Sequence, residues 1–178
     1  MGHSYAHLYE IPMTFFRFFT VYGAWGRPDM AYFKFVDSIL KGHPIDVYNY
    51  GQNTRDFTYI EDLIEAIERL IDIVPGAARA VDMDSLSPIA PHRVVNIGLA
   101  QPVGLMDFIA SIERALGKNA VLNMLPPQPG DVESTFASCE LLRKLTGYAP
   151  QTSLEVGVQR FVDWYKHHYH VEDSNVIG

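Results

Sequence analysis

Apolar residues along this chain occur either as short continuous runs or at helical spacing. The runs at residues 13–19 and 93–98 are β-prone and typical of strands buried on both faces of a parallel sheet. Residues 44–51, 56–60 and 121–125 predict shorter strands, the first of which ends in a turn. The pattern therefore predicts an α/β protein.

Stripes of apolar residues with a period near 3.6 predict the helices. They are expected over residues 30–42, 60–74, 104–117 and 139–145, and from residue 154 onward. Gly42, Pro75 and Gly117 are stop signals for three of them. Between residues 76 and 92 small and polar residues without periodicity predict a surface loop.

The composition fits a globular domain and narrows its partners. Of 178 residues, 48% are hydrophobic and 20% are charged, which suits one domain with a core. No apolar run approaches the ~20 residues of a membrane span, so no membrane partner is expected. The net charge of −7 argues against nucleic acid. Cys139 stands alone and predicts neither a disulfide nor a metal site, so a cytoplasmic setting is the simplest expectation.

Polar side chains cluster just after the run at residues 13–19. The run breaks in the turn-forming sequence GAWGRPD, which predicts a loop that carries Thr20, Tyr22, Arg27 and Asp29. In open α/β sheets ligands bind outside the carboxyl ends of the strands. We therefore expect these residues to form one wall of a binding site.

Three separated segments resemble one known family. RFFTVYGAWGRPDMA resembles the RFF-(N/T)-VYGP-x-GRPDM segment of NAD-dependent nucleotide-sugar epimerases and dehydratases, the extended short-chain dehydrogenase/reductase family. Residues 55–62 resemble its RDF-x-(Y/H)-(I/V)-x-D motif, and residues 128–131 its (R/Q)-x-G-D motif. Thr20 followed by GRPDMA is similar to the UDP-glucuronate 4-epimerases within it. Residues 1–178 are thus expected to be the C-terminal half: the last part of a Rossmann-type parallel sheet plus the small mixed α/β substrate-binding lobe.

The resemblance implies roles for individual residues. The backbone of Phe18 would meet the nicotinamide amide of NAD, and Thr20 would be the catalytic hydroxyl beside the sugar. Substrate binding is implied for Thr20, Arg27, Asp29, Met30, Tyr48, Arg55 and Asp131.

The implied substrate contacts differ in kind. Arg27 would clamp the sugar carboxylate or the phosphates, Arg55 the diphosphate, and Asp131 the ribose hydroxyls. Tyr48 would lie against the uracil base, or it merely packs in a half-buried strand. Arg55 has an alternative too, pairing with Asp56 or a nearby carboxylate.

By resemblance, the complete enzyme would be a homodimer that oxidises C4 of a UDP-sugar with tightly held NAD and returns the hydride to the other face. UDP-glucuronate would become UDP-galacturonate. The alternatives are a UDP-glucuronate decarboxylase, a nucleotide-sugar 4,6-dehydratase, or a non-catalytic sugar-nucleotide-binding remnant.

Two features of the family are missing from the sequence. There is no Gly-x-x-Gly-x-x-Gly turn, and none of the ten tyrosines is followed by lysine four residues later. Residues 1–10 read as the end of a helix, with no capping residue in front. We therefore expect the NAD-binding half to be absent and the chain alone to be inactive.

Overall fold

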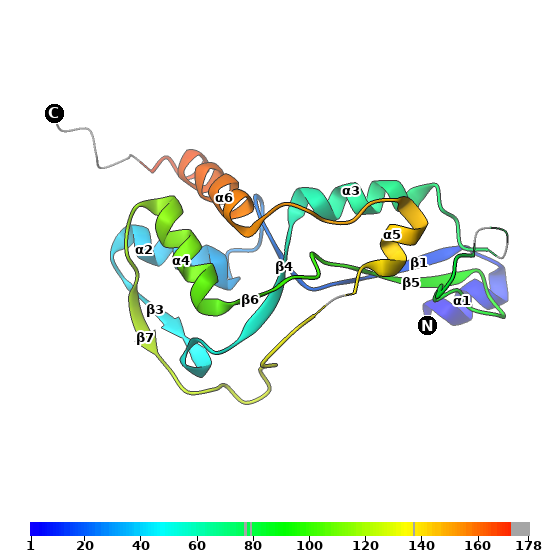
Figure 1. Ribbon diagram of the computed structural model, residues 1–178, viewed down its shortest axis with the longest axis horizontal. Helices are drawn as coiled ribbons and strands as arrows, with labels where there is room; N and C mark the ends of the chain where they lie inside the picture. Colours follow the sequence, from blue (N-terminus) through cyan, green and yellow to red (C-terminus); the bar gives the residue numbers. More distant parts are fainter. Residues whose placement is uncertain (77, 79, 137, 172–178) are drawn as a thin grey trace. The chain divides into compact units, whose positions relative to one another are not determined.

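The computed structural model describes residues 1–76, 78, 80–136 and 138–171, and the chain divides into two compact units. Unit 1 comprises Met1–Val21, Asp56–Pro102 and Thr135–Gln151. Unit 2 comprises Tyr22–Arg55, Val103–Ser134 and Thr152–Gly178. Figure 1 labels the helices and all strands except β2 (Thr20–Tyr22).

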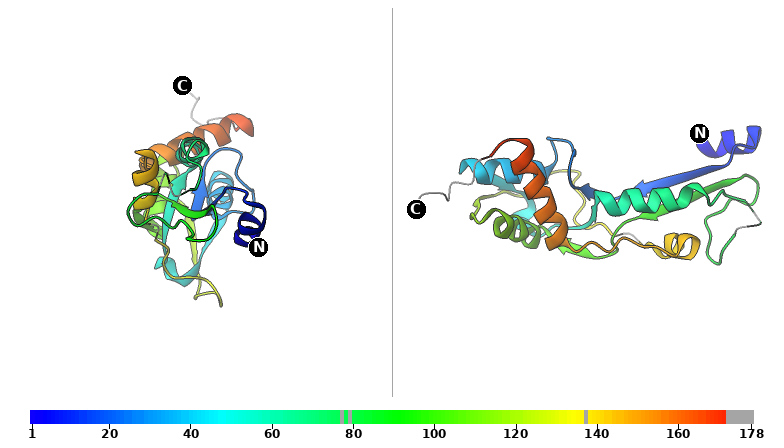
Figure 2. Two further views of the ribbon diagram at one scale, coloured as in Figure 1. Left: turned by 90° about the vertical axis from the view of Figure 1, so that its right-hand side faces the viewer. Right: turned by 90° about the horizontal axis from the view of Figure 1, so that it is seen from above.

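Unit 1 is built on two parallel strands, β1 (Met13–Phe18) and β5 (His92–Ile97). Their register runs from Met13 opposite His92 to Phe18 opposite Ile97. Helix α3 (Ile60–Ile71) runs alongside these strands (Figure 2), and α5 (Glu140–Thr146) packs against both α3 and β5. The buried core that they share consists of Leu63, Ala66, Leu70, Val95, Ile97, Cys139 and Leu142. The parallel pairing predicted from the apolar runs is confirmed.

The other face of the β1–β5 pair is only partly covered. Helix α1 (Gly2–Tyr9) contacts this face, where its Gly2 meets the Phe15 ring and its His3 lies edge-on to His92 at 5.1 Å. Phe15 nevertheless stays 44% exposed, and Phe18, at the strand end, 48%. The prediction of a strand buried on both faces is therefore wrong here. An eight-residue helix is too short to cover the length of β1.

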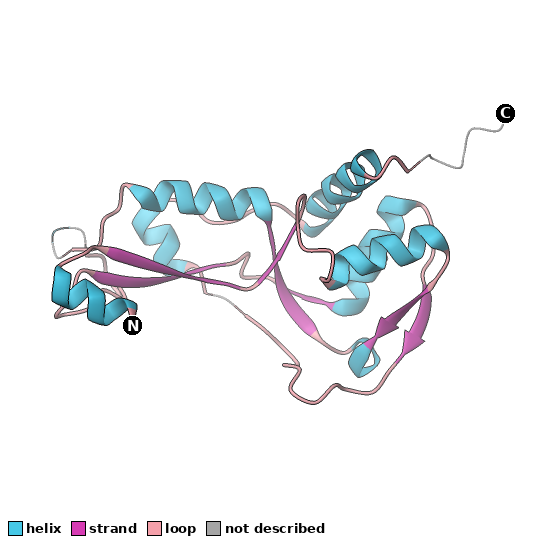
Figure 3. Ribbon diagram, turned by 180° about the vertical axis from the view of Figure 1, so that it is seen from behind, coloured by secondary structure: helices cyan, strands magenta, loops and turns pink. Residues whose placement is uncertain are grey.

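Unit 2 packs three helices beside a short parallel ribbon of β3 (Pro44–Val47) and β7 (Val121–Met124). The helices are α2 (Ala31–Lys41), α4 (Leu105–Leu116) and α6 (Leu154–His168), and Figure 3 shows α2 and α4 beside the ribbon. Their buried side chains include Phe33, Val36, Ile39, Phe108, Ile112, Val158, Phe161 and Val162. Tyr22 also belongs to this core, because it is buried and its hydroxyl packs directly against Gly157 of α6. A Cβ atom at position 157 would collide with that hydroxyl.

Three short strands carry the chain between the units: β2 (Thr20–Tyr22), β4 (Thr54–Tyr59) and β6 (Pro102–Gly104), hydrogen-bonded in the order β2-β4-β6. The sequence placed Thr20 and Tyr22 in a loop, and this prediction is wrong. Tyr22 is 2% exposed and cannot line a ligand site. A three-residue strand is too short to show an alternating pattern, so only its pairing reveals it.

The predicted helices are confirmed with small changes at their ends. Gly42 and Gly117 end α2 and α4 with φ of 71° and 65°, the left-handed region that glycine favours. Helix α3 ends at Ile71 rather than at residue 74. Ala77 and Arg79 of the predicted loop lie outside the described residues. Within the described residues, no helix has both the length and the apolar character to span a membrane.

A buried ion pair fixes the segment that precedes β5. Arg93 is fully buried, and its Nε and Nη2 donate to the two carboxylate oxygens of Asp84 at 2.8 Å each. Its Nη1 donates to the carbonyl of Ile73 at 3.3 Å. Burial alone would raise the pKa of Asp84, but the hydrogen bonds and charge of Arg93 outweigh it and hold that pKa below its usual range.

We expect Asp84→Asn to lower the free energy of unfolding by about 3 kcal/mol, because it removes the charge to which Nε and Nη2 of the buried Arg93 both donate. Urea denaturation followed by far-UV circular dichroism measures the change. The matched control is Asp82→Asn, since Asp82 pairs with Lys144 at 3.2 Å but is 87% exposed. An equal loss in both variants would contradict this role of the buried pair.

The same ion pair predicts a pH dependence with a defined sign. Because the folded-state pKa of Asp84 is lowered, the stability that it contributes is present above the ordinary aspartate pKa of about 3.9 and is lost as the pH falls toward the folded value. The difference in unfolding free energy between the unchanged chain and Asp84→Asn should therefore narrow as the pH falls through 4. A difference that stays constant down to pH 3 would contradict this.

Candidate functional site

The turn at Tyr48–Gly51, which we call η1, has an unusual backbone, because its middle residues are left-handed and not helical. Asn49, Tyr50 and Gly51 follow one another with φ of 51°, 49° and 75°, all in the left-handed region. Asparagine and glycine tolerate this region, whereas for tyrosine it is strained. Such strain tends to occur at functional sites, where the surrounding structure imposes it. Tyr48 lies in this turn and not in a strand, and it is half-buried.

Arg55 lies at the beginning of β4 and is held on three sides. Its Nη1 donates to the carbonyls of Thr54 and Glu133 at 2.9 and 3.1 Å, and its Nη2 donates to Oδ1 of Asp131 at 2.7 Å. The guanidinium therefore links the beginning of β4 to the loop that follows β7. Arg55 thus pairs with a nearby carboxylate, as one of the alternatives from the sequence had it. That carboxylate belongs to Asp131, which is itself a predicted site residue. Asp56 instead accepts from the backbone amides of Leu99 and Ala100 at 3.1 Å each.

Asp131 is presented by a tight turn. The amide of Asp131 donates to the carbonyl of Gln128 at 3.1 Å, Pro129 occupies the second position, and Gly130 has φ of 85°. These are the features of a type II turn, which requires positive φ at its third position. The sequence Gln-Pro-Gly-Asp thus fixes the backbone position from which the Asp131 side chain extends.

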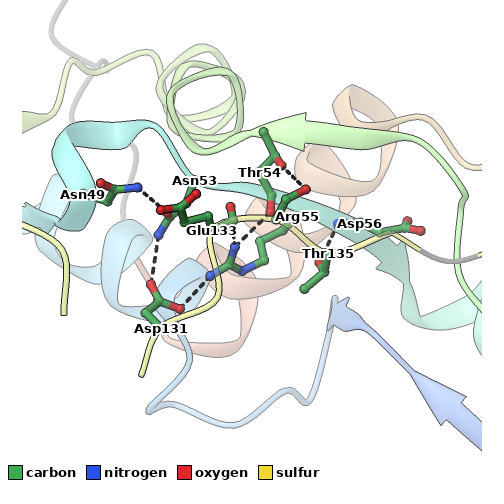
Figure 4. Close-up of polar contacts among 9 residues, drawn as sticks. Asn49, Asn53, Thr54, Arg55, Asp56, Asp131, Glu133 and Thr135 are labelled. Carbon is green, nitrogen blue, oxygen red and sulfur yellow. Dashed lines mark hydrogen bonds and ion pairs between the residues drawn. The ribbon is translucent and has the colours of Figure 1, made fainter. Parts of the chain in front are cut away.

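Two asparagines complete a chain of polar contacts with this carboxylate (Figure 4). Asn53 donates from Nδ2 to Oδ2 of Asp131 at 2.9 Å, and its Oδ1 accepts from Nδ2 of Asn49 at 2.7 Å. The loop is further tied to β4 by a parallel bridge between Thr54 and Ser134, whose hydroxyls lie 2.7 Å apart. Residues from three separate segments are therefore locked together at one place.

This cluster retains capacity to bind a further polar molecule. Arg55 has five N–H donors, and one on Nη2 and the one on Nε have no partner among the described residues. Each oxygen of Asp131 accepts one hydrogen bond here and has a second lone pair. The side chains of Arg55 and Asp131 are 19% and 38% exposed, so solvent reaches both. The site can accept an anion and a hydroxyl group side by side.

Three other predicted residues form a separate group on the loop before α2. Arg27 pairs with Asp29, with Nε and Oδ1 3.4 Å apart, and its Nη2 lies 3.1 Å from the sulfur of Met30. Arg27 and Asp29 are 73% and 68% exposed. Met30 is the residue before α2, and its amide donates to the carbonyl of Arg27 at 3.1 Å. These charges are open to solvent and are held mainly by each other.

Aromatic contacts hold the same loop against α6. Trp25, with φ of 60°, lies edge-on to Trp164 at 5.4 Å and to His168 at 5.0 Å. Trp164 and His168 are themselves stacked at 5.0 Å with an angle of 10° between their rings. The loop that carries Arg27 therefore rests on the last turns of this helix.

The remaining two predicted residues, Phe18 and Thr20, lie in unit 1. Phe18 ends β1 and stacks on Phe16 at 6.1 Å, and Thr20 opens β2 and is half-buried. Asn49 and Asn53 lie outside the motifs and were not predicted from the sequence. The sequence does offer one signal for them: two asparagines lie four residues apart around Gly51, in the turn between two predicted strands. Within the described residues, no group of three histidine, cysteine or acidic side chains forms a metal site.

Comparison with known proteins gives a consistent set of relatives. Residues 1–81 match the NAD dependent epimerase/dehydratase family. A probable UDP-glucuronate 4-epimerase of Rhizobium meliloti (strain 1021) is 57% identical over 173 residues, which cover 95% of this chain and 51% of that protein. UDP-glucuronate 4-epimerase 4 of Arabidopsis thaliana is 40% identical over 173 residues, covering 95% of this chain and 39% of that protein.

Solved structures agree with the sequence relatives. The UDP-glucuronic acid 4-epimerase of Bacillus cereus, in complex with UDP-glucuronic acid and NAD, matches with a TM-score of 0.77 and 32% identity. The match covers 94% of this chain and 49% of that one. The expected mixed α/β fold of the Rossmann type is confirmed. The chain spans about half the length of the relatives that it matches.

We expect Trp25→Ala to loosen the loop before α2. Losing two edge-on aromatic contacts costs roughly 1 kcal/mol, so the amide of Met30 should exchange its hydrogen about fivefold faster. Hydrogen exchange followed by mass spectrometry measures this. Tyr50→Ala, which removes another exposed aromatic ring of unit 2, serves as the control. Unchanged protection in Trp25→Ala would show that the aromatic contacts do not hold the loop.

Proposed function

We propose that this chain is the UDP-sugar-binding portion of a nucleotide-sugar 4-epimerase of the NAD dependent epimerase/dehydratase family, which its residues 1–81 match. The observation that carries the proposal is the Arg55–Asp131 pair beside the strained turn at Tyr48–Gly51. A cation with spare donors next to an anion with spare lone pairs matches a diphosphate joined to a ribose.

Each side chain of this pair has a part suited to its chemistry. Arg55 binds the diphosphate through its Nε and Nη2 donors, since a planar fork fits two phosphate oxygens. Asp131 accepts hydrogen bonds from the ribose hydroxyls. The half-buried Tyr48 offers a ring against which the uracil base packs. Each of these roles can be filled while the contacts between Arg55 and Asp131 persist.

The loop before α2 and the beginning of β2 serve the sugar. Arg27 clamps the sugar carboxylate or the phosphates, which its 73% exposure permits. Asp29 and Met30 contribute backbone contacts to the nucleotide. Thr20 supplies the hydroxyl beside the reacting carbon.

The residues present do not build a site for NAD. Phe18 is the single residue of this chain that the proposal places against the cofactor, and it is 48% exposed at a strand end. The sequence contains no Gly-x-x-Gly-x-x-Gly turn and no tyrosine with lysine four residues later. We therefore propose that residues 1–178 correspond to the C-terminal half of the enzyme and bind the substrate but not NAD. NAD and the base would be held by the other half.

The proposed reaction of the whole enzyme is the interconversion of UDP-glucuronate and UDP-galacturonate. The names of the relatives from Rhizobium meliloti, Arabidopsis thaliana and Bacillus cereus support this choice. The contribution of this chain is placement, because the hydride chemistry belongs to the nicotinamide. A homodimeric enzyme and a cytoplasmic location stay predictions.

We expect the 178-residue chain to bind UDP, and Arg55→Ala to weaken that binding about thirtyfold. Losing hydrogen bonds to the charged diphosphate costs about 2 kcal/mol. Isothermal titration calorimetry with UDP and with uridine separates the phosphate contribution, because uridine, which has no diphosphate, should lose much less affinity than UDP. Arg55→Lys keeps the charge without the fork and should lie between the two.

Arg69→Ala is the matched control, because Arg69 pairs with Glu65 on the exposed side of α3 and should not affect UDP. No UDP binding by the unchanged chain would overturn the proposed function. The same instrument tests NAD, for which we expect no binding to this chain.

The reaction itself is tested on the longer protein that is encoded when the reading frame is extended upstream of Met1. We expect an in-frame Gly-rich turn and a Tyr-x-x-x-Lys pair, and with them conversion of UDP-glucuronate to UDP-galacturonate. Release of CO2 from UDP-glucuronate would identify a decarboxylase instead. In-frame stop codons directly upstream would leave the sugar-nucleotide-binding remnant as the interpretation.

A further inference from the structure

We propose that Asn53 is a positioning residue that orients the Asp131 carboxylate toward the ribose hydroxyls of a uridine nucleotide. The inference rests on the proposed function and adds to it a residue that lies outside the three sequence motifs. Asn53 does not touch the reacting atoms; it acts through Asp131.

Asn53 is held in a single orientation. Asn53 is only 6% exposed, and both the nitrogen and the oxygen of its side-chain amide are hydrogen-bonded. Because the Asp131 carboxylate only accepts hydrogen bonds, the amide nitrogen of Asn53 must face it. The amide oxygen must then face Asn49, which presents its own nitrogen at 2.7 Å. The carboxylate thus dictates the direction of the whole chain of amides.

Asn53 and Arg55 hold different oxygens of the same carboxylate. Arg55 donates to Oδ1 at 2.7 Å and Asn53 to Oδ2 at 2.9 Å. With Arg55 alone, the carboxylate could rotate about its bond to Cβ. Two donors from two directions fix its plane and leave one lone pair of each oxygen available. A vicinal diol presents two O–H donors with a matching separation, so we expect the fixed plane to favour the ribose.

The backbone of Asn53 explains why this side chain is a firm support. Its carbonyl accepts from the amide of Leu105, the first residue of α4, at 2.9 Å. Asn49, on the other side, belongs to the strained turn. The backbone of Asn53 is therefore bonded to the beginning of α4 and its side chain to the turn at Tyr48–Gly51. These bonds keep the Asn53 donor in a fixed position beside Asp131.

The test compares UDP with 2′,3′-dideoxy-UDP, which lacks both ribose hydroxyls, by isothermal titration calorimetry of the 178-residue chain. Asn53→Leu keeps the size of the side chain and removes the donor. We expect about a tenfold loss of UDP affinity and less than a twofold loss for the dideoxy nucleotide. Asn53→Asp places two carboxylates together and should reduce UDP affinity further. It also carries the test if Asn53→Leu does not fold.

The matched control is Asn123→Leu, because Asn123 makes the same amide-to-carboxylate bond with Asp46, at 2.7 Å, on exposed β7. It should leave both affinities unchanged. Equal weakening of both nucleotides in the Asn53 variants would assign Asn53 a structural role only and overturn this inference alone. No UDP binding by the unchanged chain would overturn the proposed function and this inference with it.

Discussion

The ion pair between Arg55 and Asp131 is the contact on which the candidate site depends. It joins the beginning of β4 to a loop 76 residues further along the chain, with Nη2 and Oδ1 2.7 Å apart. Between residues 125 and 134 the loop contains no helix or strand, and apart from the turn at Gln128–Asp131 its backbone bonds reach other segments, such as the bond from the amide of Thr54 to the carbonyl of Glu133 at 2.9 Å. The bonds from Arg55 to the Glu133 carbonyl and the Thr54–Ser134 bridge secure the same segment. Local sequence sets the turn at Asp131, and Arg55 together with the backbone bonds to β4 sets where the rest of the loop lies.

The same pair combines a structural and a binding role without conflict. A guanidinium has more donors, and a carboxylate more lone pairs, than a single ion pair uses. Partial exposure matters equally, because a fully buried pair would be costly to approach and an exposed one would be weakened by solvent. The pair of Arg93 and Asp84 differs from it in burial, with side chains 0% and 5% exposed. That pair is buried and bonded through both carboxylate oxygens, which suits a structural anchor and leaves no room for a ligand.

Much of the fold follows from local pattern. The helical stripes located both ends of α2, α3 and α4 to within three residues and the beginning of α6, and the apolar runs located β1 and β5. The pattern failed for β2 and β6, because three residues cannot show an alternation, and for the second face of β1, because burial depends on what packs there. Of the site, the motifs gave Arg55 and Asp131, whereas Asn49 and Asn53 carry no motif and emerged only from their contacts.

The sequence by itself determined the class of fold, the resemblance to the epimerases and the charged residues of the candidate site, because periodicity and short motifs are local properties of the chain. Only the tertiary structure decided which carboxylate Arg55 meets, that Tyr22 is core, and that two asparagines link the turn at Tyr48–Gly51 to Asp131. The physical reason is sequence separation. Arg55 and Asp131 are 76 residues apart and Asn53 and Asp131 are 78, and no local preference encodes a partner at that distance.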